Sequence, residues 1–177
     1  TVSRASLHNG DEVARKDVRP GDRIRVQRAG DVIPEVVGVV NPDRANRAEP
    51  FSMPENCPAC GSAVERDGAY HICPAGLSCP PQLQGALEHF VSREAMDIES
   101  LGEKNIEQLV SKGLVKDIAD LYAISVDALM ELDGFAEQSA KNVYEAIQGS
   151  KNPALERFIY ALGIRHVGTH VACVLAQ

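Results

Sequence analysis

The 177-residue sequence contains no tryptophan, and aromatic residues make up only 5% of it. It has no apolar run near the roughly 18–20 residues that a membrane-spanning helix requires, so we expect no membrane partner. It also lacks a signal peptide and an initiator methionine, which suggests a piece of a longer chain. Because 44% of the residues are hydrophobic and 24% are charged, the composition is globular and excludes a disordered, collagen-like or coiled-coil chain.

An overall excess of positive charge is also absent, since the formal net charge is −7. Residues 1–47 carry nine basic and seven acidic side chains, residues 48–81 carry one and four, and residues 82–177 carry eight and fourteen. The acidic last part argues against non-specific adhesion to nucleic acid through a broad basic surface. Any phosphate bound there must be held by backbone amides and a few placed cations.

The first part of the chain is predicted to form β-strands. Polar and apolar residues largely alternate over residues 23–28, and residues 32–40 are mostly β-branched and apolar. Pro34 cannot donate to a strand ladder and suggests an edge strand or a bulge. These short strands suggest a small barrel, and residues 1–40 are too few to close one, so we expect the barrel to begin upstream. Residues 41–56 contain three prolines and are interpreted as a linker.

Four of the five cysteines fall within 23 residues. Cys57 and Cys60 are separated by two residues, Cys73 follows after twelve more, and Cys79 after a further five. Two such pairs converge on one point and complete a tetrahedral sulfur shell, which is the closed arrangement of structural zinc. Two disulfides or a redox Cys-x-x-Cys are the alternatives, disfavoured because neither an export signal nor a βαβ context is present.

Two further residues with metal-binding side chains are not expected to be ligands. His71 is weighed as an additional ligand, but four cysteines already fill the site. Cys173 lies in an apolar helical stretch and is expected to be a small buried hydrophobe.

From residue 81 onward the hydrophobic period is that of helices. Three apolar faces are expected to be buried. They consist of Leu83, Leu87, Phe90 and Val91; of Ala140, Val143 and Ile147; and of Leu155, Phe158, Ile159 and Leu162. Gly113, Gly149 and Gly163 are expected to end helices, and Asn152–Pro153 to begin one.

An internal repeat aligns residues 98–106, 132–140 and 164–172, at spacings of 34 and 32 residues. Each copy has an apolar residue, a tight turn around a hydrophobe, and a helix start. This resembles the helix-hairpin-helix motif, whose Gly-h-Gly turn presents helix N-terminal amides to a DNA phosphate. The first glycine position holds Ser100, Gly134 and His166, and the second holds Gly102, Ala136 and Gly168. Helix-capping turns and a tetratricopeptide repeat are the alternatives, although the tryptophan and proline signature of the latter is missing.

Five segments in the same order carry a wider resemblance. They are residues 2–9, residues 28–36, the cysteine spacing with Cys79–Gln82, residues 89–97 and residues 161–168. Through them the whole chain resembles the C-terminal half of bacterial NAD-dependent DNA ligases. The resemblance implies a multidomain fold, β and then α, with part of an OB-fold barrel at 1–48, a linker and four-cysteine zinc finger at 49–81, and an all-α helix-hairpin-helix domain at 82–177. A fourth hairpin and a BRCT domain would lie beyond Gln177.

The resemblance further implies nick sealing in duplex DNA during replication and repair. In that family a lysine takes AMP from NAD and passes it to the 5′-phosphate of the nick, and the 3′-hydroxyl then displaces it. The lysine belongs to a nucleotidyltransferase domain, and no Lys-x-Asp-Gly motif occurs here. We therefore assign no catalytic residue and expect this chain to be inactive alone. Zn²⁺ is expected in this chain, whereas NAD and Mg²⁺ are expected only for the parent enzyme.

Candidate DNA contacts follow from the same resemblance and from the repeat. On the β part they are Arg4, His8 and Asn9, with Arg28 and Lys16 as weaker candidates. At the repeat they are the backbone at Gly102, Gly134, His166 and Gly168 and the cations Lys104, Lys141 and Arg165. Each cation has the alternative of a plain surface charge or ion pair. A β-branched residue in the second glycine position is expected to strain the turn.

Phosphate contacts position a protein without reading sequence, so we expect sequence-independent binding to duplex DNA, preferably nicked. We expect a monomer in the bacterial cytoplasm, associated with the nucleoid. The alternative is a zinc-stabilised scaffold that binds a protein partner, with the hairpins acting only as turns between helices.

Overall fold

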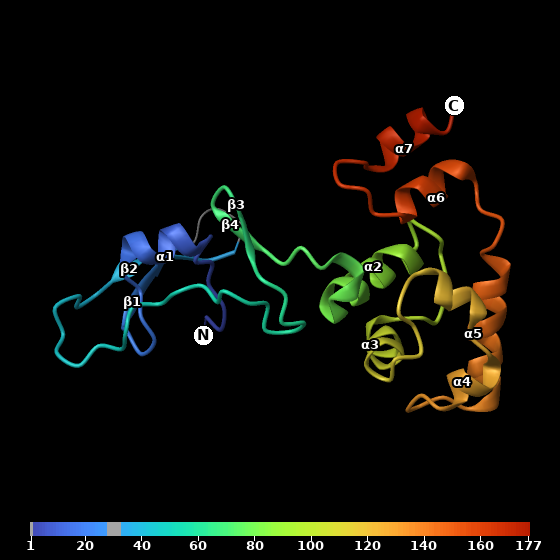
Figure 1. Ribbon diagram of the computed structural model, residues 1–177, viewed down its shortest axis with the longest axis horizontal. Helices are drawn as coiled ribbons and strands as arrows, with labels where there is room; N and C mark the ends of the chain where they lie inside the picture. Colours follow the sequence, from blue (N-terminus) through green and yellow to red (C-terminus); the bar gives the residue numbers. More distant parts are fainter. Residues whose placement is uncertain (1, 28–32) are drawn as a thin grey trace. The chain divides into compact units, whose positions relative to one another are not determined.

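The computed structural model describes residues 2–27 and 33–177, and the chain divides into two compact units, residues 1–74 and residues 75–177 (Figure 1). The elements of the first unit are α1 (Gly10–Lys16), β1 (Ile24–Gln27), β2 (Glu35–Val39), β3 (Glu65–Asp67) and β4 (Tyr70–Ile72). Those of the second are η1 (Gly76–Ser78), α2 (Pro80–Val91), α3 (Glu103–Ser111), η2 (Ala119–Ala123), α4 (Val126–Met130), α5 (Glu137–Gly149), α6 (Leu155–Ala161) and α7 (Thr169–Leu175).

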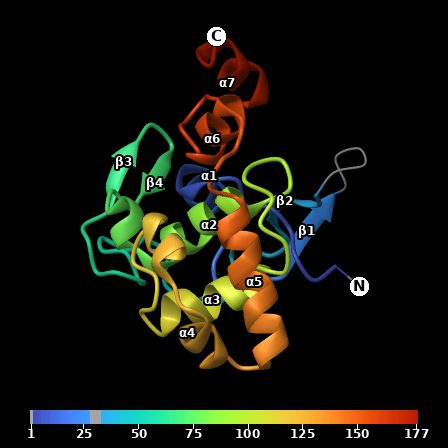
Figure 2. The same cartoon turned by 90° about the vertical axis from the view of Figure 1, so that its right-hand side faces the viewer.

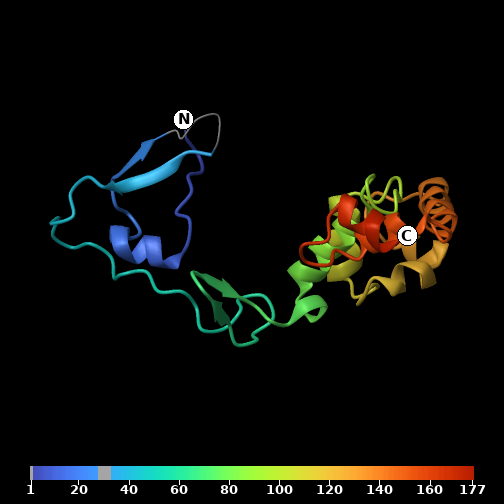
Figure 3. The ribbon, with the colours of Figure 1, turned by 90° about the horizontal axis from the view of Figure 1, so that it is seen from above.

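The two strands predicted in the first part are present as β1 and β2, which pair antiparallel (Figure 3). Their register shifts between Arg25 and Val26, so that one residue of β2, Val37, has no partner. This is a bulge, as the position of Pro34 suggested nearby. On its other side β2 is bridged by Ser6, whose N–H donates to the Pro34 carbonyl at 2.7 Å. Among the described residues these segments form an open sheet and no closed barrel.

Helix α1 was not predicted from the sequence. Its N-cap is Asn9, whose side-chain oxygen accepts a hydrogen bond from the Glu12 N–H at 2.9 Å. Acidic residues lie in its first turn and basic residues in its last, which matches the helix dipole. Only Val13 is buried, so the helix has almost no hydrophobic period to detect.

An ionic cluster around Arg47 holds the first unit together. Val13 and Val36 are the only buried hydrophobic side chains among its described residues. Arg47, with 7% of its side chain exposed, donates to the carboxylates of Asp17 at 2.6 Å and Asp22 at 2.8 Å. These bonds raise the pKa of Arg47 and lower the pKa of both aspartates. The start of the predicted linker is therefore attached to the β part.

The second unit has one hydrophobic core, built by α2, α3, η2, α4 and α5 (Figure 2). The predicted faces of α2 and α5 are buried: Leu87, Phe90 and Val143 are at most 1% exposed. Phe90 meets Tyr122 edge to face, with 6.3 Å between ring centroids. Burial of each such side chain contributes about 1.5–3 kcal/mol.

The third predicted apolar face is not buried. Leu155, Phe158 and Leu162 of the α6 region are 40–55% exposed. Helices α6 and α7 pack on each other beyond the C-terminal end of α5 (Figures 1 and 2), and α2 makes a smaller contact with α6 that leaves these side chains largely exposed. Arg157 anchors α6, since its Nε donates to the Ala95 carbonyl at 2.8 Å. The prediction of a buried face was wrong because apolar periodicity does not show which faces find a partner.

Two of the three glycine caps are confirmed. Gly113 and Gly163 follow α3 and α6 with φ of 68° and 63°, the left-handed conformation that favours glycine. Gly149 is instead the last residue of α5, and Ser150 is the C-cap. The predicted start at Asn152–Pro153 was wrong, because α6 begins at Leu155 after the N-cap Ala154. No helix in the described ranges has the length and apolarity needed to cross a membrane.

Candidate metal centre and nucleic-acid interface

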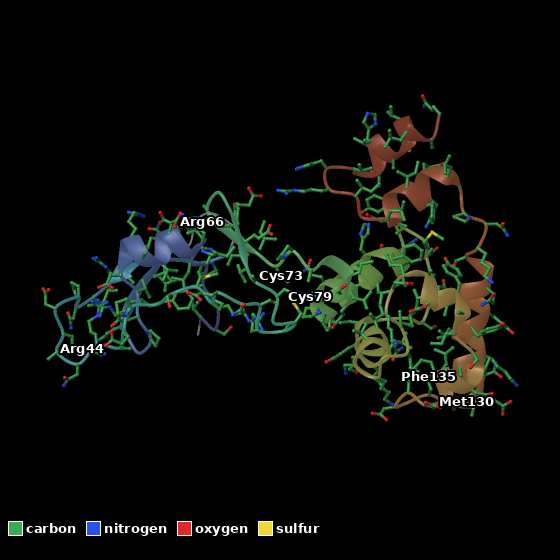
Figure 4. The ribbon with its side chains drawn as sticks, viewed as in Figure 1. Arg44, Arg66, Cys73, Cys79, Met130 and Phe135 are labelled. Atoms are coloured by element: carbon green, nitrogen blue, oxygen red, sulfur yellow. The ribbon has the colours of Figure 1, made fainter. Side chains whose placement is uncertain are left out.

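The four clustered cysteines come together in space. Their sulfur atoms all lie within 4.8 Å of one another, and those of Cys60 and Cys73 are 3.4 Å apart. Figure 4 shows Cys73 beside Cys79. Sulfurs bound to one zinc ion at about 2.3 Å would be separated by about 3.8 Å in a tetrahedron, so the cluster fits a metal ion. All five cysteines lie in the described ranges, and none of them forms a disulfide in the structure.

Local hydrogen bonds shape the first cysteine pair into a tight turn. The Gly61 N–H donates to the Cys57 carbonyl, and the Cys57 N–H donates to the Ser62 carbonyl, both at 2.8 Å. Gly61 has a φ of 75°, which its missing Cβ permits. Cys79 is the N-cap of α2, where the helix dipole favours a thiolate.

The surroundings of Cys60 favour its thiolate, the form that binds a metal ion. Hydrogen bonding with the Ser62 side chain and backbone, followed by that with the neighbouring cysteines, lowers the pKa of Cys60 to about 6. A thiolate, not a thiol, is the metal ligand, so this environment favours binding at neutral pH.

His71 and Cys173 lie outside the cluster. The His71 ring packs on α1, where its Cε1 would be 3.4 Å from a Cβ added to Gly10. Arg66 of β3 adds to this contact by donating to both carboxylate oxygens of Asp11 at 2.9 Å. Cys173 is exposed, so the prediction of a buried residue was wrong; α7 belongs to the helical pair that is left uncovered.

The three repeat copies share one backbone path. We call residues 98–106, 132–140 and 164–172 junctions 1, 2 and 3. The first glycine position is left-handed in each, with φ of 64° at Ser100, 86° at Gly134 and 67° at His166. The second position is the N-cap of the following helix, with φ of −82° at Gly102, −109° at Ala136 and −84° at Gly168.

This geometry corrects one expectation. The second position has extended backbone that any residue adopts, so a β-branched side chain there meets no strain from the turn. A Cβ added to Gly102 or Gly168 would have no atom within 4 Å. The left-handed requirement belongs to the first position, where Ser100 and His166 adopt it without being glycine.

Two junctions converge on one small cleft. A cavity of about 180 Å³ is lined by Ser100 and Asn105 from junction 1 and by Gly134, Phe135 and Ser139 from junction 2, together with Asn142 and Val143. Ser139 Oγ accepts the Ala136 N–H at 2.8 Å, and Asn105 Nδ2 donates to the Ser100 carbonyl at 3.0 Å. The Asn105 N–H already donates to the Gly102 carbonyl at 3.0 Å. The donors that a helix start offers to a ligand are therefore the amides before it, at residues 103–104 of α3, and the corresponding amides at residues 137–138 of α5.

The predicted cations differ in their surroundings. Lys104 is exposed beside Gly102. Lys141 Nζ bonds Glu137 Oε1 at 2.5 Å, which lowers the pKa of that glutamate and neutralises an acid at the start of α5. Arg165 is exposed, and it already takes part in an interaction within the protein. Lys141 therefore follows the ion-pair alternative, since its charge is already compensated.

The described candidates on the β part differ in the contacts that they make. Arg4 is exposed. His8 Nε2 lies 2.9 Å from Glu35 Oε2, and Asn9 caps α1 through its side chain. Lys16 is largely buried and donates to the Val36 carbonyl at 2.7 Å, so it serves the fold. Arg28 lies outside the described residues.

Comparison with known proteins first defines the class of the β part. Residues 1–48 match the family model described as the NAD-dependent DNA ligase OB-fold domain. The open sheet of β1, β2 and the bridging segment at Ser6 is thus part of a ligase-type OB-fold.

Over its whole length the chain is similar to bacterial DNA ligases. It is 55% identical to the DNA ligase of Syntrophus aciditrophicus over all of this chain and 26% of that protein. The corresponding values are 53% and 27% for the DNA ligase of Methylococcus capsulatus, and 51% and 24% for that of Pseudomonas paraeruginosa. The resemblance found in the sequence is confirmed, and the chain spans about a quarter of the length of these relatives.

Proposed function

We propose that this chain is the DNA-binding region of an NAD-dependent DNA ligase and that it clamps duplex DNA through phosphate contacts without reading sequence. The observation that carries the proposal is the shared backbone of the three junctions, each of which ends in a helix N-terminus. Such a terminus offers unpaired N–H groups and the positive end of a dipole to an anion. It works without a basic surface, which suits a helical unit of net charge −6.

The four-cysteine cluster would hold a structural zinc ion. Four thiolates leave no open coordination position, so the ion stabilises the fold of the cysteine segment and performs no chemistry. We divide the chain into an OB-fold at 1–48, the zinc segment at 49–81 and the helix-hairpin-helix domain at 82–177. Arg4, His8, Asn9 and Arg28 would contact DNA from the OB-fold side.

The parent protein would seal nicks during replication and repair in the bacterial cytoplasm. Adenylation by NAD with Mg²⁺ needs a lysine nucleophile in a nucleotidyltransferase domain, and this sequence contains no Lys-x-Asp-Gly motif. This chain would therefore bind the substrate, preferably nicked duplex, and would not itself join DNA.

Binding of the chain to a fluorescent nicked duplex across a salt series tests the proposal. We expect binding at low salt, equal affinity for unrelated sequences, and a logarithmic salt slope of about −0.9 for each phosphate contacted. No binding at 50 mM salt would instead favour the protein-interaction scaffold, for which the exposed apolar residues of α6 and α7 would offer a surface.

A further inference from the structure

We propose that Gln108 is a positioning residue that sets the turn of junction 2 for phosphate binding; this inference rests on the proposed function. Gln108 lies on α3, which begins at junction 1, yet its side chain reaches the turn of junction 2. Its Oε1 accepts the Asp133 N–H at 2.6 Å, and its Nε2 donates to the Asp133 carbonyl at 3.2 Å. One amide side chain thereby satisfies both backbone polar groups of the residue that precedes Gly134.

A second side chain from the same end of α3 strengthens this link. Lys112 Nζ donates to the Glu131 carbonyl at 2.5 Å and lies 4.0 Å from a carboxylate oxygen of Asp133. The Asp133 side chain is 93% exposed, so packing of that side chain does not fix the turn. Hydrogen bonds from α3 therefore act together with the turn's own bond, from the Phe135 N–H to the Leu132 carbonyl at 3.2 Å, to hold the chain as it enters the left-handed conformation at Gly134.

The contact is particular to junction 2 and is not a general feature of the repeat. The repeat spacing places Asn142 and Val174 at the positions equivalent to Gln108. Asn142 accepts a hydrogen bond from Gln138 on its own helix at 2.8 Å, and valine has no polar group to offer. Among the described residues, Gln108 is the only amide side chain that joins the helix following one junction to the turn of another.

The consequence concerns two phosphates bound together. Binding the N-termini of α3 and α5 to one DNA molecule costs less conformational freedom when their separation is set before binding. The core shared by Ile106, Leu132 and Val143 holds the two helices together, and Gln108 sets the turn itself, because it belongs to the helix of one site and bonds the turn of the other.

Gln108→Met tests the inference, since methionine keeps the length of the side chain but loses both hydrogen bonds. We expect several-fold weaker binding to the nicked duplex and a salt slope smaller by up to about 0.9, the loss of one phosphate. Helicity and Tm should stay near those of the unchanged chain, because Gln108 is only half-buried. Gln108→Asn, which is too short to span the gap, should give the same result without an apolar group.

Gln148→Met on α5 is the matched control and should bind as the unchanged chain does. Hydrogen exchange at the Asp133 amide gives a readout without DNA and should become faster in Gln108→Met. Unchanged exchange, or unchanged affinity and slope despite faster exchange, would overturn the inference alone. Failure of the unchanged chain to bind would overturn the proposed function and this inference with it.

Discussion

The Arg47 guanidinium and the Asp22 carboxylate form a buried ion pair, 2.8 Å apart, with 7% and 2% of their side chains exposed. They are 25 residues apart in the sequence and join the segment after β2 to the turn before β1. Because few hydrophobic side chains are buried in the first unit, this pair and the Asp17 contact take the place of a larger core.

Replacing Arg47 by alanine should therefore destabilise the first unit. The substitution leaves Asp22 buried without its cation, which costs more than the loss of a surface pair. Differential scanning calorimetry should show a lower Tm for that unit alone. Arg44→Ala is the control, because Arg44 is exposed and makes one 3.4 Å hydrogen bond to the Gly21 carbonyl; equal effects of the two variants would contradict this role (Figure 4).

Acid should weaken the same cluster. Asp17 and Asp22 have pKa values lowered by their arginine partners, so each contributes stability that is present above its unfolded pKa of about 3.9. That contribution is lost as the pH falls through the lower folded value. Urea unfolding between pH 6 and pH 2 should show the loss, and Arg47→Ala should flatten it. A pH dependence identical in both proteins would contradict the cluster as its source.

Removing one metal ligand should unfold the cysteine segment and leave the helical unit folded. A structural zinc contributes on the order of 10–16 kcal/mol of apparent binding free energy, and residues 57–79 build no core of their own. Cys73→Ser should lose the metal in elemental analysis while most of the helical circular dichroism remains. Cys173→Ser should retain one metal ion per chain, since Cys173 lies outside the cluster. A chain purified without metal, or with two disulfides in mass spectrometry, would refute the zinc site.

A bulky residue at the second glycine position of junction 1 should weaken DNA binding. Gly102→Val places its side chain in open space and in extended backbone, so the fold should tolerate it while the phosphate is pushed away. Lys104→Ala should cost less and reduce the salt slope by about 0.9 or less. Gly85→Val on α2 controls for the substitution itself. If Lys104→Ala abolishes binding and Gly102→Val leaves it intact, side-chain charge carries the contact.

The sequence predicted the structure correctly where a local hydrophobic period or a spacing between residues determines it. Alternation predicted β1, a β-branched apolar run predicted β2, and cysteine spacing predicted the cluster. The buried faces of α2 and α5 follow the helical period. The repeat alignment matched positions that share backbone angles, even where serine or histidine replaces glycine.

Features that depend on one residue or on distant pairing were beyond that reasoning. Helix α1 buries only Val13 and is specified mainly by its Asn9 cap and its charged ends. The face of α6 has the same period as a buried one, but exposure depends on which element packs there. The Gln108 contact with Asp133 joins a side chain to a backbone 25 residues away, and no periodic pattern records such a bond.

The proposed function requires backbone amides at the helix starts to hold DNA phosphates. An amide proton–nitrogen correlation spectrum of the ¹⁵N-labelled chain, titrated with nicked duplex, observes those amides directly. We expect the largest shifts on the first-turn amides of α3 and α5, at residues 103–104 and 137–138, and we expect them to persist in Lys104→Ala. Shifts confined to other surfaces, with these amides unmoved at saturation, would contradict it.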